Sequence, residues 1–145
     1  MNESPIFSRT YDFLLWLLPQ AVKLPRAYRF TLAERLQARA LDFQETLIAA
    51  GLASGAVRGR WLQRADTQLA QLRQALRLCH DLSLITLRQY EHAAERLTEI
   101  GRLLGGWRKT LGKTGPAEGA RRRVEQQSQE LPRRLPEQER PDELQ

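Results

Sequence analysis

Apolar residues recur every three or four positions in three long segments of the chain, which is the spacing of one face of an α-helix. The first stripe comprises Leu36, Ala40, Phe43, Leu47 and Ala50, the second Leu62, Ala65, Leu69, Leu72, Leu76 and Cys79, and the third Tyr90, Ala93, Leu97, Ile100, Leu104, Trp107 and Leu111. Up to residue 113, no segment alternates apolar and polar residues as a half-buried strand does. With a further apolar helix near the N-terminus, the pattern predicts an all-α fold, an antiparallel four-helix bundle with helices near residues 5–22, 32–50, 56–81 and 87–111.

Residues with strong preferences for helix ends support these boundaries. Thr86 with Gln89, and Thr31 with Glu34, have the spacing of a capping box at a helix N-terminus. Gly51 follows the first stripe directly and predicts the end of that helix.

The first helix is expected to begin at Ser4 and Pro5, a good N-cap and first-turn pair, and to end or kink around Pro19. Its apolar residues fill two faces: Phe7, Tyr11, Leu14 and Leu18 on one, and Phe13, Trp16 and Leu17 on the other. Because one core cannot bury both faces, we expect Phe13, Trp16 and Leu17 to form an oligomer interface. The alternative is that the C-terminal tail folds back over this face.

The composition changes near Lys113, after which prolines and glycines interrupt a stretch with few large apolar residues. We therefore expect residues 1–113 to form the bundle and residues 114–145 to be a disordered tail rich in Pro, Glu and Arg. The 145-residue chain has a net charge of +6, and 20 of its 23 basic residues are arginines. Residues 1–113 hold 17 basic and 10 acidic residues, so the excess positive charge belongs to the bundle and favours phosphate or carboxylate partners.

Few residues are suited to catalysis. Cys79 occupies a stripe position, where a cysteine acts as a small hydrophobe, and neither His80 beside Asp81 nor His92 among its neighbouring glutamates forms a convincing cluster. No Glu-x-x-His pair for a di-iron site and no glycine-rich phosphate loop occurs. The sequence predicts a protein that is not an enzyme and that needs no metal or cofactor.

Gly105 and Gly106 lie inside the last predicted helix, where each costs roughly 1 kcal/mol relative to alanine. Such a cost suggests that another backbone approaches closely, either a helix of the same chain, which we favour, or a neighbouring subunit.

The longest apolar run, Phe13 to Leu18, is far shorter than the roughly 20 residues that span a bilayer. The N-terminus also lacks the pattern of a secretory signal, and the single cysteine suits a reducing compartment. We expect a cytoplasmic protein without membrane contact.

Basic residues gather around the connection that precedes the second helix. Lys23, Arg26 and Arg29 surround Tyr28, and Arg35 and Arg39 follow one turn apart. Cations on consecutive turns beside an aromatic ring are typical of surfaces that bind the nucleic-acid backbone. The competing interpretation is a solvated helix face, partly neutralised by nearby carboxylates. Two further basic groups are candidates for the same role: Arg73 with Arg77, which Asp81 can also pair, and Arg102, Arg108 and Lys109.

Several segments resemble the accessory variability determinant proteins of diversity-generating retroelements, within a four-helix-bundle family that includes proteins encoded by intervening sequences of 23S ribosomal RNA. They are LPQA from Leu18 to Ala21, LPRAYRFTLAERLQ from Leu24 to Gln37, and the segment from Ala65 to Lys109, in which EIGRLLGGW is similar to the retroelement branch. The resemblance covers roughly residues 6–112.

The resemblance implies a basic, non-enzymatic subunit that assembles as a homopentameric barrel and binds both nucleic acid and the reverse transcriptase of the retroelement. Such a subunit supports reverse transcription of a template RNA into mutagenised cDNA that replaces a variable repeat in a target gene. Two alternatives remain: an RNA-binding protein of the ribosomal intervening-sequence type, and a plain oligomeric scaffold with no nucleic-acid partner.

Overall fold

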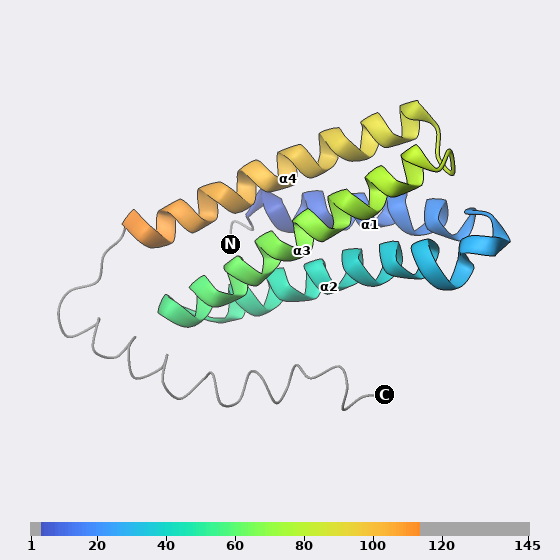
Figure 1. Ribbon diagram of the computed structural model, residues 1–145. Helices are drawn as coiled ribbons and strands as arrows, with labels where there is room; N and C mark the ends of the chain where they lie inside the picture. The colour runs from blue at the N-terminus through green and yellow to red at the C-terminus, as the bar shows by residue number, and fades with distance from the viewer. Residues whose placement is uncertain (1–3, 114–145) are drawn as a thin grey trace.

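The computed structural model describes residues 4–113, which form four α-helices (Figure 1). These are α1 (Pro5–Val22), α2 (Glu34–Leu52), α3 (Gly55–Asp81) and α4 (Leu87–Lys113), and the connection between α1 and α2 contains the 3-10 turn η1 (Arg26–Tyr28) and the π-helical turn η2 (Arg29–Ala33). No strand occurs among these residues, so the predicted all-α four-helix fold is confirmed, with helix boundaries close to the expected ones. The predicted tail, residues 114–145, lies outside the described residues.

Each helix runs antiparallel to the next, and α1 packs against both α2 and α4 (Figure 1). The connection between α1 and α2 lies at the same end of the bundle as the turn between α3 and α4, and we call this the turn end. A hydrogen bond joins α1 to α4 near this end, because Gln89 Nε2 donates to Gln20 Oε1 at 3.1 Å. The α2–α3 connection lies at the opposite end.

One apolar core runs through the bundle and contains most members of the three predicted stripes. Its largest fully buried side chains come from all four helices and include Ile6, Phe43, Leu62, Leu69, Leu97 and Ile100. Tyr90, Trp107 and Leu111, at the two ends of the last stripe, are partly buried and pack against it. The heptad-like spacing therefore identified the buried side of each long helix.

The expectation that Phe13 and Leu17 lie on an exposed face of α1 is wrong. Phe13 is only 3% exposed and Leu17 1%, so both lie in the core of a single chain. Trp16 is half-buried and packs its ring against His92 of α4, with 4.6 Å between ring centroids. Because α1 has neighbours on two sides, α2 and α4, it buries a wider arc than one stripe. Phe13 and Leu17 are therefore not available as an oligomer interface.

The N-termini of α1 and α4 are capped as predicted. Ser4 is the N-cap of α1, with Pro5 in its first turn, and Pro19 lies inside the helix, which continues to Val22. At α4, the backbone N–H of Gln89 donates to Thr86 Oγ1 at 3.0 Å, and the backbone N–H of Thr86 donates to Gln89 Oε1 at 2.8 Å. These two hydrogen bonds form a capping box.

The expected capping box at Thr31 and Glu34 is absent. Thr31 lies inside η2, and its hydroxyl donates to the Tyr28 carbonyl at 3.5 Å rather than capping α2. The π-helical turn leads directly into α2, so this helix needs no separate cap at Thr31.

Three glycines behave differently from the expectation. The α2 helix extends past Gly51 to Leu52, and a Cβ at Gly51 would lie 3.2 Å from Phe7 Cζ, so this glycine allows α1 to approach. Within residues 4–113, a Cβ at Gly105 or Gly106 would meet no atom within 4 Å beyond the neighbouring backbone of its own helix. Packing against α1, α2 or α3 therefore does not explain these two glycines.

Candidate nucleic-acid interface

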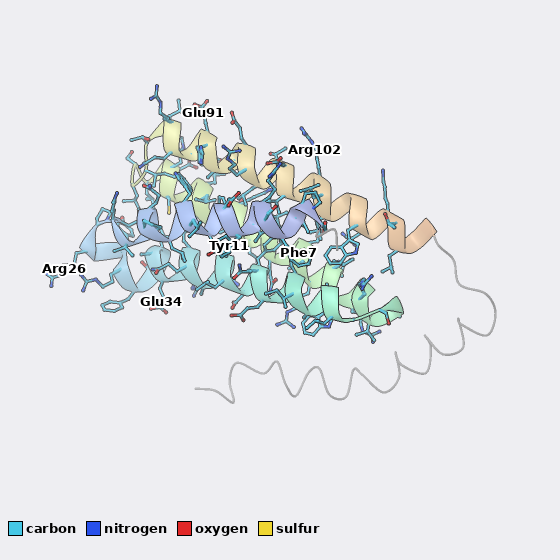
Figure 2. All side chains as sticks on the ribbon, turned by 180° about the vertical axis from the view of Figure 1, so that it is seen from behind. Phe7, Tyr11, Arg26, Glu34, Glu91 and Arg102 are labelled. Atoms are coloured by element: carbon cyan, nitrogen blue, oxygen red, sulfur yellow. The ribbon has the colours of Figure 1, made fainter. Side chains whose placement is uncertain are left out.

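Four exposed cations lie at the turn end: Lys23, Arg26 and Arg29 in the connection between α1 and α2, and Arg35 in the first turn of α2. Among residues 4–113, no hydrogen bond or ion pair holds any of these four side chains. Figure 2 shows Arg26 at the extremity of the bundle. The surface therefore offers several cationic groups to a ligand without first breaking an internal contact.

The backbone below these cations is held in place. Leu24 is buried in the core, and Pro25 directly after it is the N-cap of η1, where the Tyr28 amide donates to the Pro25 carbonyl at 2.9 Å. A buried anchor and a hydrogen-bonded turn fix the backbone, so Arg26 and Arg29 project from an ordered support.

An exposed aromatic ring, Phe30, lies directly beside Arg29 and is 78% accessible to solvent. Sequence reasoning did not single it out, because Phe30 precedes the buried Ala33 by three positions and has the spacing of one more member of the α2 stripe. The π-helical turn takes more residues per turn than an α-helix and rotates Phe30 away from the core face. In the sequence, only the neighbouring arginines indicate that Phe30 belongs to a binding surface.

Three other predicted cations contact groups of the same chain. Arg39 Nη1 donates to Gln71 Oε1 at 3.1 Å, and Arg77 lies 3.7 Å from the Asp81 carboxylate. Arg73 Nη2 donates to the Leu97 backbone carbonyl at 3.0 Å and so joins α3 to α4.

The third basic group, Arg102, Arg108 and Lys109, lies on the half of α4 remote from the turn end, as the position of Arg102 relative to Arg26 in Figure 2 shows. Arg108 is held by Asp66 at 3.3 Å and by Gln63 at 2.6 Å, whereas Arg102 and Lys109 are exposed. Arg102 and Lys109 therefore belong to a surface separate from that of the turn-end cations.

The residues considered for catalysis, His80 and Cys79, pack against neighbouring groups of the bundle. The ring of His80 stacks on Tyr90, with 4.8 Å between centroids, and Nδ1 of His80 lies 3.0 Å from the Asp81 carboxylate. Cys79 is buried, and burial raises the pKa of its thiol, which opposes formation of a reactive thiolate. Within residues 4–113, no three His, Cys, Asp or Glu side chains gather in a way that suits a metal ion.

A second surface feature is an apolar face shared by α1 and α2. Tyr11 and Leu15 of α1, and Leu41 and Ile48 of α2, are all exposed. Between the two helices lies a groove of about 340 Å³, lined mainly by Phe7, Tyr11, Gln44, Leu47 and Ile48. The sequence analysis placed an exposed apolar face on α1 but assigned the wrong residues to it.

No described helix is both long enough and apolar enough to cross a membrane.

Comparison with known proteins gives a family and a fold. No curated protein matches the chain. Among solved structures, a protein of unknown function from the S23 ribosomal protein family of Bacteroides thetaiotaomicron is similar, with a TM-score of 0.67 and 21% identity over 72% of this chain and 95% of that one. At this identity the likeness concerns the fold. The model of the bAvd-like family matches residues 6–111, which cover nearly the full length of the four helices, and the chain therefore belongs to the bAvd-like family of accessory variability determinant proteins.

Proposed function

We propose that this chain is a non-catalytic accessory subunit of a diversity-generating retroelement, and that it binds the template RNA and its cDNA through the turn end. The observation that carries the proposal is the set of four exposed cations, Lys23, Arg26, Arg29 and Arg35, with no internal partner among the described residues. A surface of this kind attracts polyanions at little cost, because no ion pair has to be broken first.

The recognition is expected to be independent of base sequence. Arginine and lysine side chains on a convex turn reach phosphate oxygens, and such contacts fix the position of a nucleic acid without reading its bases. RNA and DNA then bind with similar affinity. Binding releases counterions condensed on the nucleic acid, and because this release is less favourable at higher salt, the affinity falls as salt rises.

The reverse transcriptase is the proposed protein partner, on the strength of family membership. In this arrangement the polymerase carries out the chemistry, and the present subunit holds nucleic acid close to it.

Self-association is the third part of the proposal, and the apolar face of α1 and α2 replaces Phe13, Trp16 and Leu17 as its site. Ile48, which is 47% exposed, lines the groove, and Leu15, which is 60% exposed, follows the groove residue Tyr11 by one turn of α1. Burial of such a face against a second copy removes apolar surface from water. The family resemblance favours five copies in the assembly.

The test of nucleic-acid binding compares two variants with equal loss of charge. Arg26→Gln, Arg29→Gln and Arg35→Gln together remove cations from the turn end, whereas Arg96→Gln, Arg102→Gln and Lys109→Gln remove exposed cations along α4. Filter-binding titrations with RNA and DNA at two salt concentrations give affinities and salt slopes. We expect the turn-end variant to weaken both nucleic acids alike and to flatten the slope by about 0.7 to 0.9 for each phosphate that the variant no longer neutralises.

Two results would count against this part of the proposal. Unchanged affinity and slope in both variants would favour a plain scaffold, and a loss confined to the α4 variant would move the binding surface to Arg102 and Lys109.

Copurification tests the polymerase partnership. A tagged chain is expected to retain the reverse transcriptase encoded beside its gene, with and without nuclease treatment. Absence of such a gene, or failure to retain its product, would favour the ribosomal intervening-sequence alternative. Retention lost only in the turn-end variant would place the polymerase on the basic surface.

Sedimentation tests self-association with a matched pair of variants. Ile48→Asp introduces a charge on the proposed interface, and Leu78→Asp introduces one at a position of α3 with similar exposure, 49% against 47%. We expect Ile48→Asp to dissociate the oligomer and Leu78→Asp to leave it intact. A wild-type monomer at micromolar concentration would contradict the proposal.

A further inference from the structure

The exposed ring of Phe30 is not explained by folding. A phenylalanine that is 78% exposed forgoes most of the apolar burial that usually stabilises such a residue, and among residues 4–113 no aromatic partner contacts it. Moreover, the backbone departs from α-helical geometry at this position, in a π-helical turn of the kind that recurs at functional sites.

The surroundings of Phe30 indicate what its ring meets. Arg29 is its direct neighbour and Arg26 lies one turn earlier, both exposed and without an internal partner among the described residues. A ligand for this surface therefore combines negative charge with flat apolar groups. Single-stranded nucleic acid has both features, because its phosphates alternate with unpaired bases whose faces are free to stack.

We infer that Phe30 is a stacking platform for an unpaired base, and that the turn end selects single-stranded RNA or DNA over duplex. The inference rests on the proposed function, since the arginines hold the phosphates on either side of the stacked base. In a duplex the bases are stacked on each other, so Phe30 cannot reach a base face and only the phosphate contacts remain. Single-stranded template RNA and single-stranded cDNA are the ligands that such a surface would bind.

The experiment uses the full chain and a short single strand containing 2-aminopurine, whose fluorescence decreases when an aromatic ring stacks on it. The same strand annealed to its complement is the duplex probe. The variants are Phe30→Ala, Phe30→Leu, which keeps apolar volume without a ring face, and Phe30→Trp, which keeps the ring. Val22→Ala is the matched control, because Val22 is also at the turn end and 73% exposed.

We expect Phe30→Ala and Phe30→Leu to weaken single-strand binding by about tenfold and to abolish the fluorescence decrease, as removal of one stacked ring does elsewhere. Duplex binding should be unchanged in both variants. Phe30→Trp and Val22→Ala should behave as the wild type.

Equal losses on single strand and duplex, or no loss on either, would overturn the inference. Loss of the oligomer in Phe30→Ala, or loss of the reverse transcriptase with nucleic-acid binding intact, would also overturn it, because Phe30 would then face a protein. If the turn-end variant loses binding while the Phe30 variants do not, only the stacking role fails. If the turn-end variant binds nucleic acid as the wild type does, the proposed function itself fails.

Discussion

The guanidinium of Arg73 lies against Gly101, at the point where α3 passes α4. Its Nη2 atom donates to the carbonyl of Leu97 at 3.0 Å, and a Cβ on Gly101 would lie only 2.6 Å from the same atom. Glycine at this position therefore makes room for an arginine that bridges two helices. The arrangement gives Arg73 a structural contact beside the binding role expected from the sequence.

A double-mutant cycle tests this coupling. With Arg73 present, Gly101→Ala gains about 1 kcal/mol of helix propensity but displaces a hydrogen bond of about 1 kcal/mol, so stability should change little. In the Arg73→Ala background the same substitution should stabilise the bundle by about 1 kcal/mol. Urea unfolding measures all four proteins, and additive effects would show that the two residues are independent.

Replacement of Gly105 and Gly106 by alanine should stabilise the bundle, because a Cβ at either position meets no atom of the other described helices within 4 Å. The expected gain is roughly 1 kcal/mol for each substitution. Thermal unfolding checks the stability, and sedimentation checks the assembly. Dissociation of the oligomer by Gly105→Ala and Gly106→Ala would instead show that a neighbouring subunit approaches α4 here, which is the alternative left open by the sequence.

Thr86→Ala should destabilise the protein by about 1 kcal/mol, because it removes the oxygen that accepts a hydrogen bond from the Gln89 amide. Thr86→Ser keeps that oxygen and should retain most of the stability. Denaturant unfolding of both variants makes the comparison. A similar loss in Thr86→Ser would mean that packing of the threonine methyl group, rather than capping, stabilises this helix end.

The thiol of Cys79 should react with a disulfide reagent only when the chain unfolds, because the side chain is buried and burial raises its pKa. Labelling should be slow in buffer and should follow the urea unfolding curve. The unfolded thiol ionises at a lower pH than the folded one, so stability should fall as the pH rises past the ordinary thiol pKa. Cys79→Ala should remove this part of the alkaline loss, and rapid labelling in buffer would contradict the burial.

The long stripes of α3 and α4 made the fold predictable from the sequence. Apolar residues recur on one face of each helix over many turns, and the burial of members such as Leu69 and Leu97 follows from this periodicity alone. The start of α1 and the capping box of α4 were predictable for a similar reason, since both depend on residues within one turn of each other.

The errors and omissions concern features that the spacing of apolar residues within one helix does not determine. Burial of Phe13 depends on helices packed against two sides of α1, and the spacing of residues within α1 contains no information about either. Exposure of Phe30 depends on a π-helical turn, which changes the phase of the stripe without an obvious sequence signal. The basic candidates include both free cations and cations that pair across helices, such as Arg108, and only the fold separates the two kinds.

The antiparallel order of the helices also has a practical consequence. The start of α1 and the end of α4 both lie in the half of the molecule away from the connection between α1 and α2 (Figure 1), which contains Arg26 (Figure 2). A tether attached before Ser4 therefore leaves the molecule on the side away from Arg26 and Phe30. Protein immobilised on a sensor through such a tether presents the Arg26–Phe30 segment to the solution, and a fusion partner at the same place does not compete with a strand arriving at the other end.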